Sequence, residues 1–157
     1  MLAAQSALEI GLFWFELKLM KVMGLAPQLK DCLLCHHALQ EDHAMAGPSA
    51  AASGTRNASI FSFVRGGVLC KACAPSAPIP TSSSRDEVGV PITPDILGLL
   101  RFWQSSRSWR SAQSAACTPR QTQKLERILG LFMQYHLEID NPARAVALSI
   151  LRTRITL

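Results

Sequence analysis

The chain has 157 residues, of which 48% are hydrophobic and 17% are charged. This composition excludes a disordered protein and suits one globular domain of ordinary size. No run of 18 apolar residues is free of charge, so neither a membrane-spanning helix nor a membrane partner is expected. The net charge of +5 is uneven, because residues 96–157 hold nine basic and three acidic side chains. Such a basic half attracts nucleic acid or an acidic peptide, and composition does not choose between them.

The first segment, residues 6–23, has apolar side chains at helical spacing and predicts the central helix of a small bundle. Gly24 and Pro27 mark its end, and Glu16 is expected on its hydrated side with Lys18 and Lys21. The segment lacks a basic leader, so it is not expected to be a signal peptide. The predicted apolar stripe consists of Leu8, Leu12, Phe15, Leu19 and Met23, widened by Phe13, Leu17 and Met20.

Four of the five cysteines form two CxxC pairs that are separated by 34 residues. Without an export signal the expected compartment is the reducing cytoplasm, where stable disulfides do not form. Two CxxC turns can aim four thiolates at one ion, and four protein ligands leave no open position for water. The sequence therefore predicts one structural Zn²⁺, with the ligands Cys32, Cys35, Cys70 and Cys73.

Other interpretations of these residues stay open. The pairs are alternatively ordinary buried or redox cysteines, and their spacing exceeds the usual 15–20 residues of a two-knuckle zinc site. His36, His37 and His43 are possible substitute ligands, although hydration is the expected state of histidines beside a knuckle. Cys117 is expected to be an ordinary thiol. A thioredoxin-like enzyme would place CxxC between a strand and a helix, which the flanking sequence does not favour, and no other catalytic motif is present.

The rest of the chain alternates irregular and regular segments. Residues 44–59 are small and polar and predict a loop, whereas residues 60–65 alternate with period two. Gly66 and Gly67 predict the turn of a β-hairpin that leads into Cys70, and a linker follows over residues 74–92. Three helices are expected after Thr93-Pro94, Thr118-Pro119 and Asn141-Pro142, since each pair joins a capping side chain to a proline suited to the first helical position. Their expected buried residues are Leu125, Ile128, Leu129, Phe132 and Leu137, then Val146, Leu148, Ile150 and Leu151.

These elements define the expected fold class: mainly α, a small helical bundle with an inserted Cys₄ zinc-finger β-hairpin. A single domain is expected over residues 1–157, with the zinc-finger insertion at residues 32–73. Residues 118–121 also fit a capping box, because Thr118 and Gln121 are spaced for reciprocal hydrogen bonds.

Two stretches resemble the helical domain of the bacterial DNA repair protein RecO. They are residues 15–27 followed by the first CxxC pair, and residues 61–73 with the second pair; the segment 135–137 lies where that family has a final helix pair. The resemblance implies a zinc-bearing helical domain that serves recombination mediation. It also implies binding to the acidic, apolar C-terminal tail of single-stranded DNA-binding protein, partnership with RecR, strand annealing and help in loading RecA, all at the nucleoid in the cytoplasm. The N-terminal OB-fold of that family is expected to be absent, so the chain corresponds to its C-terminal part.

A basic region between residues 99 and 127 is the candidate partner surface. Its guanidinium groups suit phosphates and carboxylates alike, and the interleaved aromatic residues suit stacking or an apolar slot. The candidate partner-binding or DNA-binding residues are Arg101, Arg107, Arg110 and Lys124, accompanied by Arg120, Arg127, Phe102, Trp103 and Trp109. Three alternatives remain: a solvated helix face with Phe102 and Trp103 in the core, direct binding of single-stranded DNA, or an inactive truncated remnant.

Overall fold

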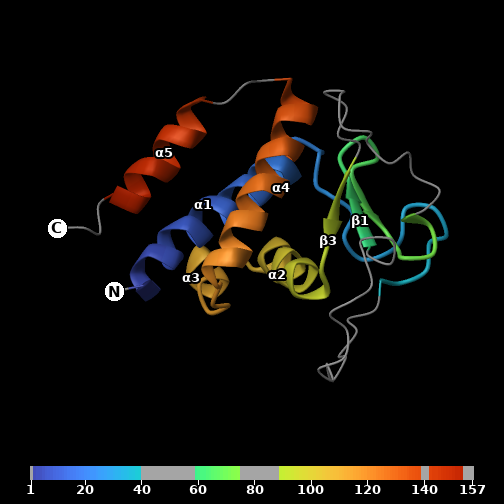
Figure 1. Ribbon diagram of the computed structural model, residues 1–157, viewed down its shortest axis with the longest axis horizontal. Helices are drawn as coiled ribbons and strands as arrows, with labels where there is room; N and C mark the ends of the chain where they lie inside the picture. The colour runs from blue at the N-terminus through green and yellow to red at the C-terminus, as the bar shows by residue number, and fades with distance from the viewer. Residues whose placement is uncertain (1, 40–58, 75–88, 139–141, 154–157) are drawn as a thin grey trace. The chain divides into compact units, whose positions relative to one another are not determined.

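The computed structural model describes residues 2–39, 59–74, 89–138 and 142–153 (Figure 1). They form the helices α1 (Leu2–Val22), α2 (Pro94–Ser105), α3 (Trp109–Ala112), α4 (Pro119–Leu137) and α5 (Pro142–Thr153), and the strands β1 (Ser59–Ser62), β2 (Gly67–Leu69) and β3 (Gly89–Ile92). The predicted class, mainly α with an inserted cysteine-bearing hairpin, is confirmed. None of the described helices is long and apolar enough to cross a membrane.

The chain divides into two compact units. The helical unit comprises residues 1–26 and 99–157, and the sheet unit comprises residues 27–98. Helix α2 begins in the sheet unit and ends in the helical unit. The inserted unit is thus longer at both ends than the expected zinc-finger insertion at residues 32–73.

A helix begins at each of the three prolines where one was predicted. Helices α2, α4 and α5 begin at Pro94, Pro119 and Pro142. The capping box of α4 is complete, since the Gln121 amide donates to the Thr118 hydroxyl at 3.3 Å and the Thr118 amide donates to the Gln121 side chain at 2.9 Å. The short helix α3 was not predicted from the sequence; Ser108 caps it by accepting a hydrogen bond from the Ser111 amide. Asn141 lies outside the described residues.

The core of the helical unit is built on α1, which contacts α3, α4 and α5. Phe13 is fully buried, and its ring centroid lies 6.1 Å from that of Trp103. The indole N–H of buried Trp103 donates to the Ala112 carbonyl at 3.1 Å, which ties α2 to α3. Helix α4 buries four of its five predicted apolar residues, Leu125, Ile128, Leu129 and Phe132.

The predicted core face of α1 was only partly right. Its widening residues Phe13, Leu17 and Met20 are buried together with Ile10, whereas Leu8 and Phe15 from the main stripe are exposed. Glu16, which was expected in water, is buried. Sequence periodicity misjudged this face because α1 is apolar on two sides, so the pattern alone could not say which side the bundle covers.

Glu16 is buried because a cation from the far end of the chain pairs with it. The Arg144 guanidinium on α5 donates to the two Glu16 carboxylate oxygens at 2.6 and 3.1 Å. Arg152, two turns later, pairs with Glu9 at 2.9 Å and also with Glu126 on α4. A buried carboxylate is tolerated when its charge is compensated and hydrogen-bonded. These pairs therefore fasten α5 to α1 through carboxylates that face inward.

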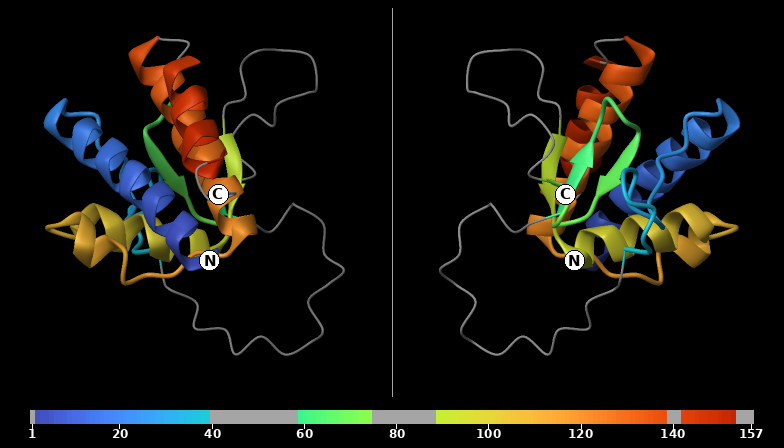
Figure 2. Two further views of the ribbon diagram at one scale, coloured as in Figure 1. Left: turned by 90° about the vertical axis from the view of Figure 1, so that its left-hand side faces the viewer. Right: turned by 90° about the vertical axis from the view of Figure 1, so that its right-hand side faces the viewer.

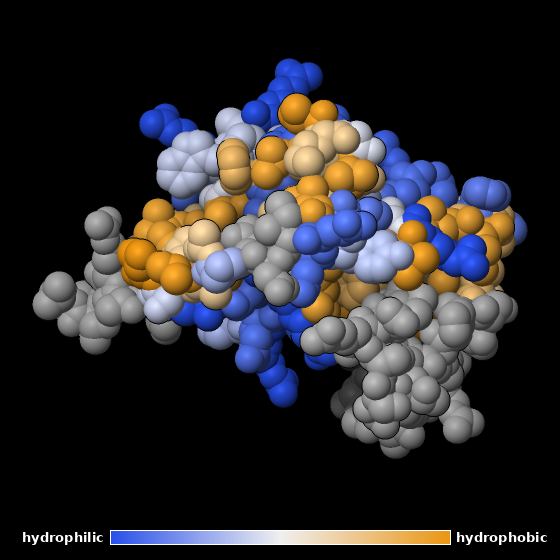
Figure 3. Space-filling view, turned by 90° about the horizontal axis from the view of Figure 1, so that it is seen from above, coloured by the Kyte–Doolittle hydropathy of each residue, from blue (hydrophilic) through white to orange (hydrophobic). Residues whose placement is uncertain are grey.

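Helix α5 itself buries less apolar surface than predicted. Leu148 is buried, but Val146 and Ile150 are exposed. Seen from above, apolar side chains lie at the surface over α5 (Figure 3). The side of α5 that meets α1 is marked by the ion pairs that Arg144 and Arg152 make with carboxylates of α1, rather than by a broad apolar face.

The sheet unit holds a three-stranded antiparallel sheet in the order β2-β1-β3. Strand β1 pairs with β2 so that Ser62 lies opposite Gly67, and with β3 so that Ser59 lies opposite Ile92. The predicted hairpin is present, but its first strand ends at Ser62 rather than at Arg65 because the turn takes up residues 63–66. Gly66 has a φ of +72°, the left-handed conformation that favours glycine.

Strand β3 is a second correction, because its residues belong to the predicted irregular linker 74–92. A strand of four residues that contains Pro91 gives a weak signal, and proline is acceptable there because β3 is an edge strand. Residues 75–88 of that linker, and residues 44–58 of the predicted loop, lie outside the described residues.

We expect Arg144→Ala to destabilise the protein by about 3–5 kcal/mol, because removing one partner leaves the buried Glu16 charge uncompensated. The matched control, Arg107→Ala at an exposed position, should cost less than about 0.5 kcal/mol. Urea unfolding followed by circular dichroism measures both free energies of unfolding.

The loss of stability caused by Arg144→Ala should also depend on pH. Burial raises the pKa of Glu16, and Arg144 opposes that rise. In the variant the pKa of Glu16 in the folded state lies further above its value in the unfolded chain. The variant therefore loses stability as pH rises from the unfolded-state pKa through the folded-state pKa, and its loss relative to wild type is smaller at acid pH. A loss below about 1 kcal/mol at every pH would contradict the inward ion pair.

Candidate metal centre

The first cysteine pair lies in a tight hairpin over residues 30–39. The Leu39 amide donates to the Lys30 carbonyl at 2.8 Å, and the Cys32 amide donates to the His37 carbonyl at 2.9 Å. His36 closes the turn with a φ of +57° and donates its amide to the Cys32 carbonyl at 3.0 Å. This backbone folds the chain back at once and leaves the side chains of His36 and His37 exposed.

The second pair lies in a single turn directly after β2. The amides of Cys73 and Ala74 both donate to the Cys70 carbonyl, at 3.0 and 2.8 Å. Because β2 ends at Leu69, Cys70 continues from the end of a paired strand. The sheet therefore fixes the position of this turn.

Backbone pairing beside β2 brings the two turns together. The Gln28 amide donates to the Gly66 carbonyl at 2.8 Å, and the Val68 amide donates to the Gln28 carbonyl at 3.1 Å. Further along, the Leu33 amide donates to the Val68 carbonyl at 3.0 Å. Residues 28–33 thus run beside β2 and deliver Cys32 to the neighbourhood of Cys70.

Glycine at position 67 makes this pairing possible. A Cβ atom there would lie 2.4 Å from the Gln28 carbonyl oxygen, a separation that a real side chain cannot adopt. Gly67 was predicted only as a turn residue, and its pairing with Gln28 was not predicted. The signal that was available was the Gly66-Gly67 pair directly before the second CxxC.

The four sulfur atoms of Cys32, Cys35, Cys70 and Cys73 all lie within 4.8 Å of one another. The Cys35 and Cys70 sulfurs, which come from different turns, are 3.7 Å apart. With zinc–sulfur bonds of about 2.3 Å, two ligands of a tetrahedral site are separated by about 3.8 Å. The separation across the two turns is therefore the one that a tetrahedral Cys₄ site requires.

Backbone amides favour a thiolate within the cluster. Burial opposes ionisation of Cys32, but amide N–H groups of Cys35, Cys70 and Leu34 outweigh it and lower the pKa of Cys32 to about 6. Conversely, hydrogen bonds with the Cys70 and Cys35 sulfurs raise the pKa of Cys73 to about 12. Four crowded sulfurs cannot all ionise unless a cation compensates their charge.

The donor set fits a zinc ion held only by the protein. Thiolates are soft ligands that select zinc among the common divalent ions. Because all four positions would be sulfur, none remains for a reacting water, and the metal would stabilise structure rather than activate a substrate. Cys117, in the helical unit, takes no part in the cluster. His43, a possible substitute ligand, lies outside the described residues.

The other predicted site residues lie in the helical unit, on three different helices or next to them. Arg107 and Arg110 flank the start of α3, and both are exposed, as is Lys124 on α4. Arg101 on α2 is partly buried. They belong to the helical unit, whereas the sulfur cluster belongs to the sheet unit.

A helical body with an inserted sheet unit that carries four clustered cysteines defines a structural or binding module, and those cysteines could hold a metal ion. The family model described as recombination protein O C terminal matches residues 1–145. The chain therefore belongs to this family, which has a role in DNA repair and recombination. No curated protein and no solved structure matches the chain.

We expect one zinc ion per chain in freshly purified, reduced protein, measured by elemental analysis. Cys35→Ser or Cys70→Ser should lose the metal, because three thiolates bind zinc far less tightly than four at a structural site. Cys117→Ser is the matched control and should keep a full equivalent. Metal-free wild-type protein would contradict the assignment.

Gly67→Ala should loosen the metal without removing a ligand. The new methyl group collides with the Gln28 carbonyl, and the resulting backbone shift displaces Cys32 from Cys70. We expect at least about a tenfold loss of zinc affinity in competition with a chelator, as for other changes that misplace ligands. Gly98→Ala is the control, since nothing lies within 4 Å of its added carbon. Equal zinc affinity in the Gly67→Ala and Gly98→Ala variants would refute the proposed role of the backbone pairing between Gln28 and Gly67.

Proposed function

We propose that this chain is the zinc-stabilised, partner-binding module of a RecO-like recombination mediator in the cytoplasm. Its partners would be the acidic, apolar C-terminal tail of single-stranded DNA-binding protein and RecR. It would act as an adaptor that holds partners together and transforms no substrate. Family membership supports the role in recombination, and the distribution of charge in the helical unit supports an acidic partner.

That charge distribution is the observation on which the proposal depends. The helical unit holds eleven basic and five acidic residues, a net charge of +6. Three of the acidic residues, Glu9, Glu16 and Glu126, pair with Arg144 and Arg152 inside the unit. The unit's negative charge is thus largely used internally, while Arg107, Arg110 and Lys124 project into solvent. An excess of exposed cations attracts an anionic partner and speeds its association.

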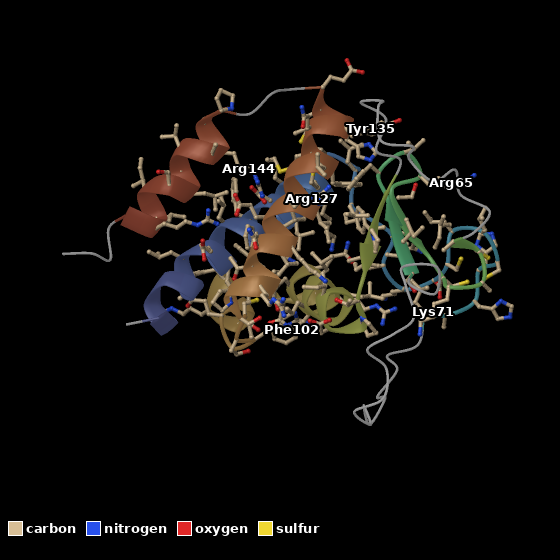
Figure 4. All side chains as sticks on the ribbon, in the orientation of Figure 1. Arg65, Lys71, Phe102, Arg127, Tyr135 and Arg144 are labelled. Carbon is tan, nitrogen blue, oxygen red and sulfur yellow. The ribbon has the colours of Figure 1, made fainter. Side chains whose placement is uncertain are left out.

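Aromatic side chains near these cations suit a peptide that ends in apolar residues. Phe102 and Trp109 are partly exposed, whereas Trp103 is buried and belongs to the core. Phe102 lies on α2 (Figure 4). Trp109 begins α3 and is followed by Arg110. An Arg-rimmed surface with exposed aromatic rings can bind a carboxylate and an apolar side chain of the same peptide.

A second candidate function is direct binding of single-stranded DNA along α4. Arg120, Lys124 and Arg127 are spaced by four and three residues, which places them on one exposed face of that helix. Figure 4 shows Arg127 on α4. A row of cations follows a phosphodiester backbone. The same row also suits an acidic peptide, so salt dependence is needed to separate the two functions.

Binding of a fluorescent acidic peptide that ends in Asp-Phe tests the proposal, because the expected tail of single-stranded DNA-binding protein ends in this way. Arg107→Glu should weaken binding about tenfold, since it replaces an attraction by a repulsion. Arg65→Glu, at an exposed position in the sheet unit, is the charge-matched control and should change binding less than twofold. The same pair of variants tests the association with RecR.

The outcome that favours the second function is distinct. If Arg107→Glu leaves peptide binding unchanged, while single-stranded DNA binds with an affinity that falls steeply with salt, the DNA-binding function replaces the adaptor. If neither ligand binds a protein whose zinc content and circular dichroism are normal, the chain is an inactive remnant.

A further inference from the structure

A line of apolar side chains remains on the surface of α1. Leu8, Phe15 and Val22 are 44%, 55% and 85% exposed, although a folded unit tends to cover side chains of this size. Leu12 and Leu19 fall between them and are partly buried. The five positions alternate in steps of four and three residues, so they form one continuous line along the helix. We call these five residues the α1 seam.

The α1 seam points away from every described helix that packs on α1. On one side, Glu9 and Glu16 meet the arginines of α5. On the other side, Gly11 faces α3, and a Cβ built on it would lie 3.7 Å from the Trp109 ring. The buried face with Phe13 and Leu17 is opposite the seam. Figure 2 shows α5 on one side of α1 and α3 on the other.

Spacing and length indicate the shape of the missing neighbour. Steps of four and three residues are the pattern that lets side chains of two helices interlock. The distance from Leu8 to Val22 is about 21 Å at 1.5 Å per residue, or about four turns of a partner helix. An extended strand would instead need side chains that repeat every second residue.

Charge indicates the chemistry of that helix. Lys18 lies on α1 beside the α1 seam, and its ammonium group donates to the Gln104 carbonyl at 2.8 Å. The neighbouring α3 adds exposed Arg110, and Arg107 precedes it. The acidic residues on the opposite side, Glu9 and Glu16, are turned inward and paired. A partner with acidic flanks is therefore complementary, whereas a second copy of the helical unit would oppose a charge of +6 with another +6.

We infer that the α1 seam is a docking surface for an amphipathic α-helix of a partner protein that carries acidic residues beside its apolar stripe. The five seam residues are not among the candidate residues of the proposed function, but the basic flank of the seam includes Arg107 and Arg110, so its selection by charge rests in part on that proposal. Apolar contacts between interlocked side chains would supply the affinity, and the basic flank would select the partner's charge.

Two 21-residue helical peptides test this inference with the full chain. Both carry Leu at the core positions of a heptad, and they differ only in having Glu or Lys at the flanking positions. We expect fluorescence anisotropy to show at least about tenfold tighter binding of the Glu peptide. Phe15→Glu should weaken that binding at least tenfold, and Leu8→Gln should weaken it to a smaller extent.

Tyr135→Glu is the matched control, because Tyr135 on α4 has a similar exposure of 49% and should leave peptide binding within twofold of wild type. Circular dichroism and zinc content verify that each variant is folded. Equal binding of the two peptides, absence of binding to both, or no effect of Phe15→Glu would overturn the inference. Self-association in sedimentation velocity that Phe15→Glu abolishes would also overturn it, since the occupant would then be a second copy.

Discussion

The register between residues 28–33 and β2 is the constraint on which the cysteine cluster depends. Neither CxxC turn can bring its sulfurs to the other by itself, because 34 residues separate the two pairs. The hydrogen bonds of Gln28 and Leu33 with the strand set the separation before any metal is considered. A register shift of one residue would move every side chain of that segment to the opposite face. Backbone complementarity at Gly67 is therefore as important to the centre as the cysteines.

The helical unit has an analogous dependence on a small number of polar contacts. Its apolar core accounts for the packing of α1 against α4, but α5 contributes only Leu148 as a fully buried apolar side chain among its described residues. The inward carboxylates of α1 and the two arginines of α5 give that interface its specificity, since only one alignment compensates the buried charge. The same pairs remove negative charge from the surface. The ion pairs between α1 and α5 thus both stabilise the helical unit and leave its exterior basic.

Local signals in the sequence predicted the elements that depend on local chemistry. Short motifs predict the helix starts at Pro94, Pro119 and Pro142 and the capping box at Thr118. They also predict the hairpin before Cys70 and the clustering of the two CxxC pairs. What depends on distant residues could not be predicted in this way. The burial of Glu16 requires Arg144, which lies 128 positions away, and the exposure of Phe15 requires knowledge of which side of α1 the other helices cover. Strand β3 is defined only by its pairing with β1.

The order of the two units along the chain has a consequence for biosynthesis. The sheet unit is continuous in sequence, whereas the helical unit is divided between residues 1–26 and 99–157. During translation the sheet unit is therefore complete while α1 still awaits α3, α4 and α5. Until Arg144 and Arg152 leave the ribosome, the Glu9 and Glu16 carboxylates of α1 lack the guanidinium groups that pair with them in the folded protein. The nascent chain passes through an interval in which its first helix needs protection, and its last helix ends that interval.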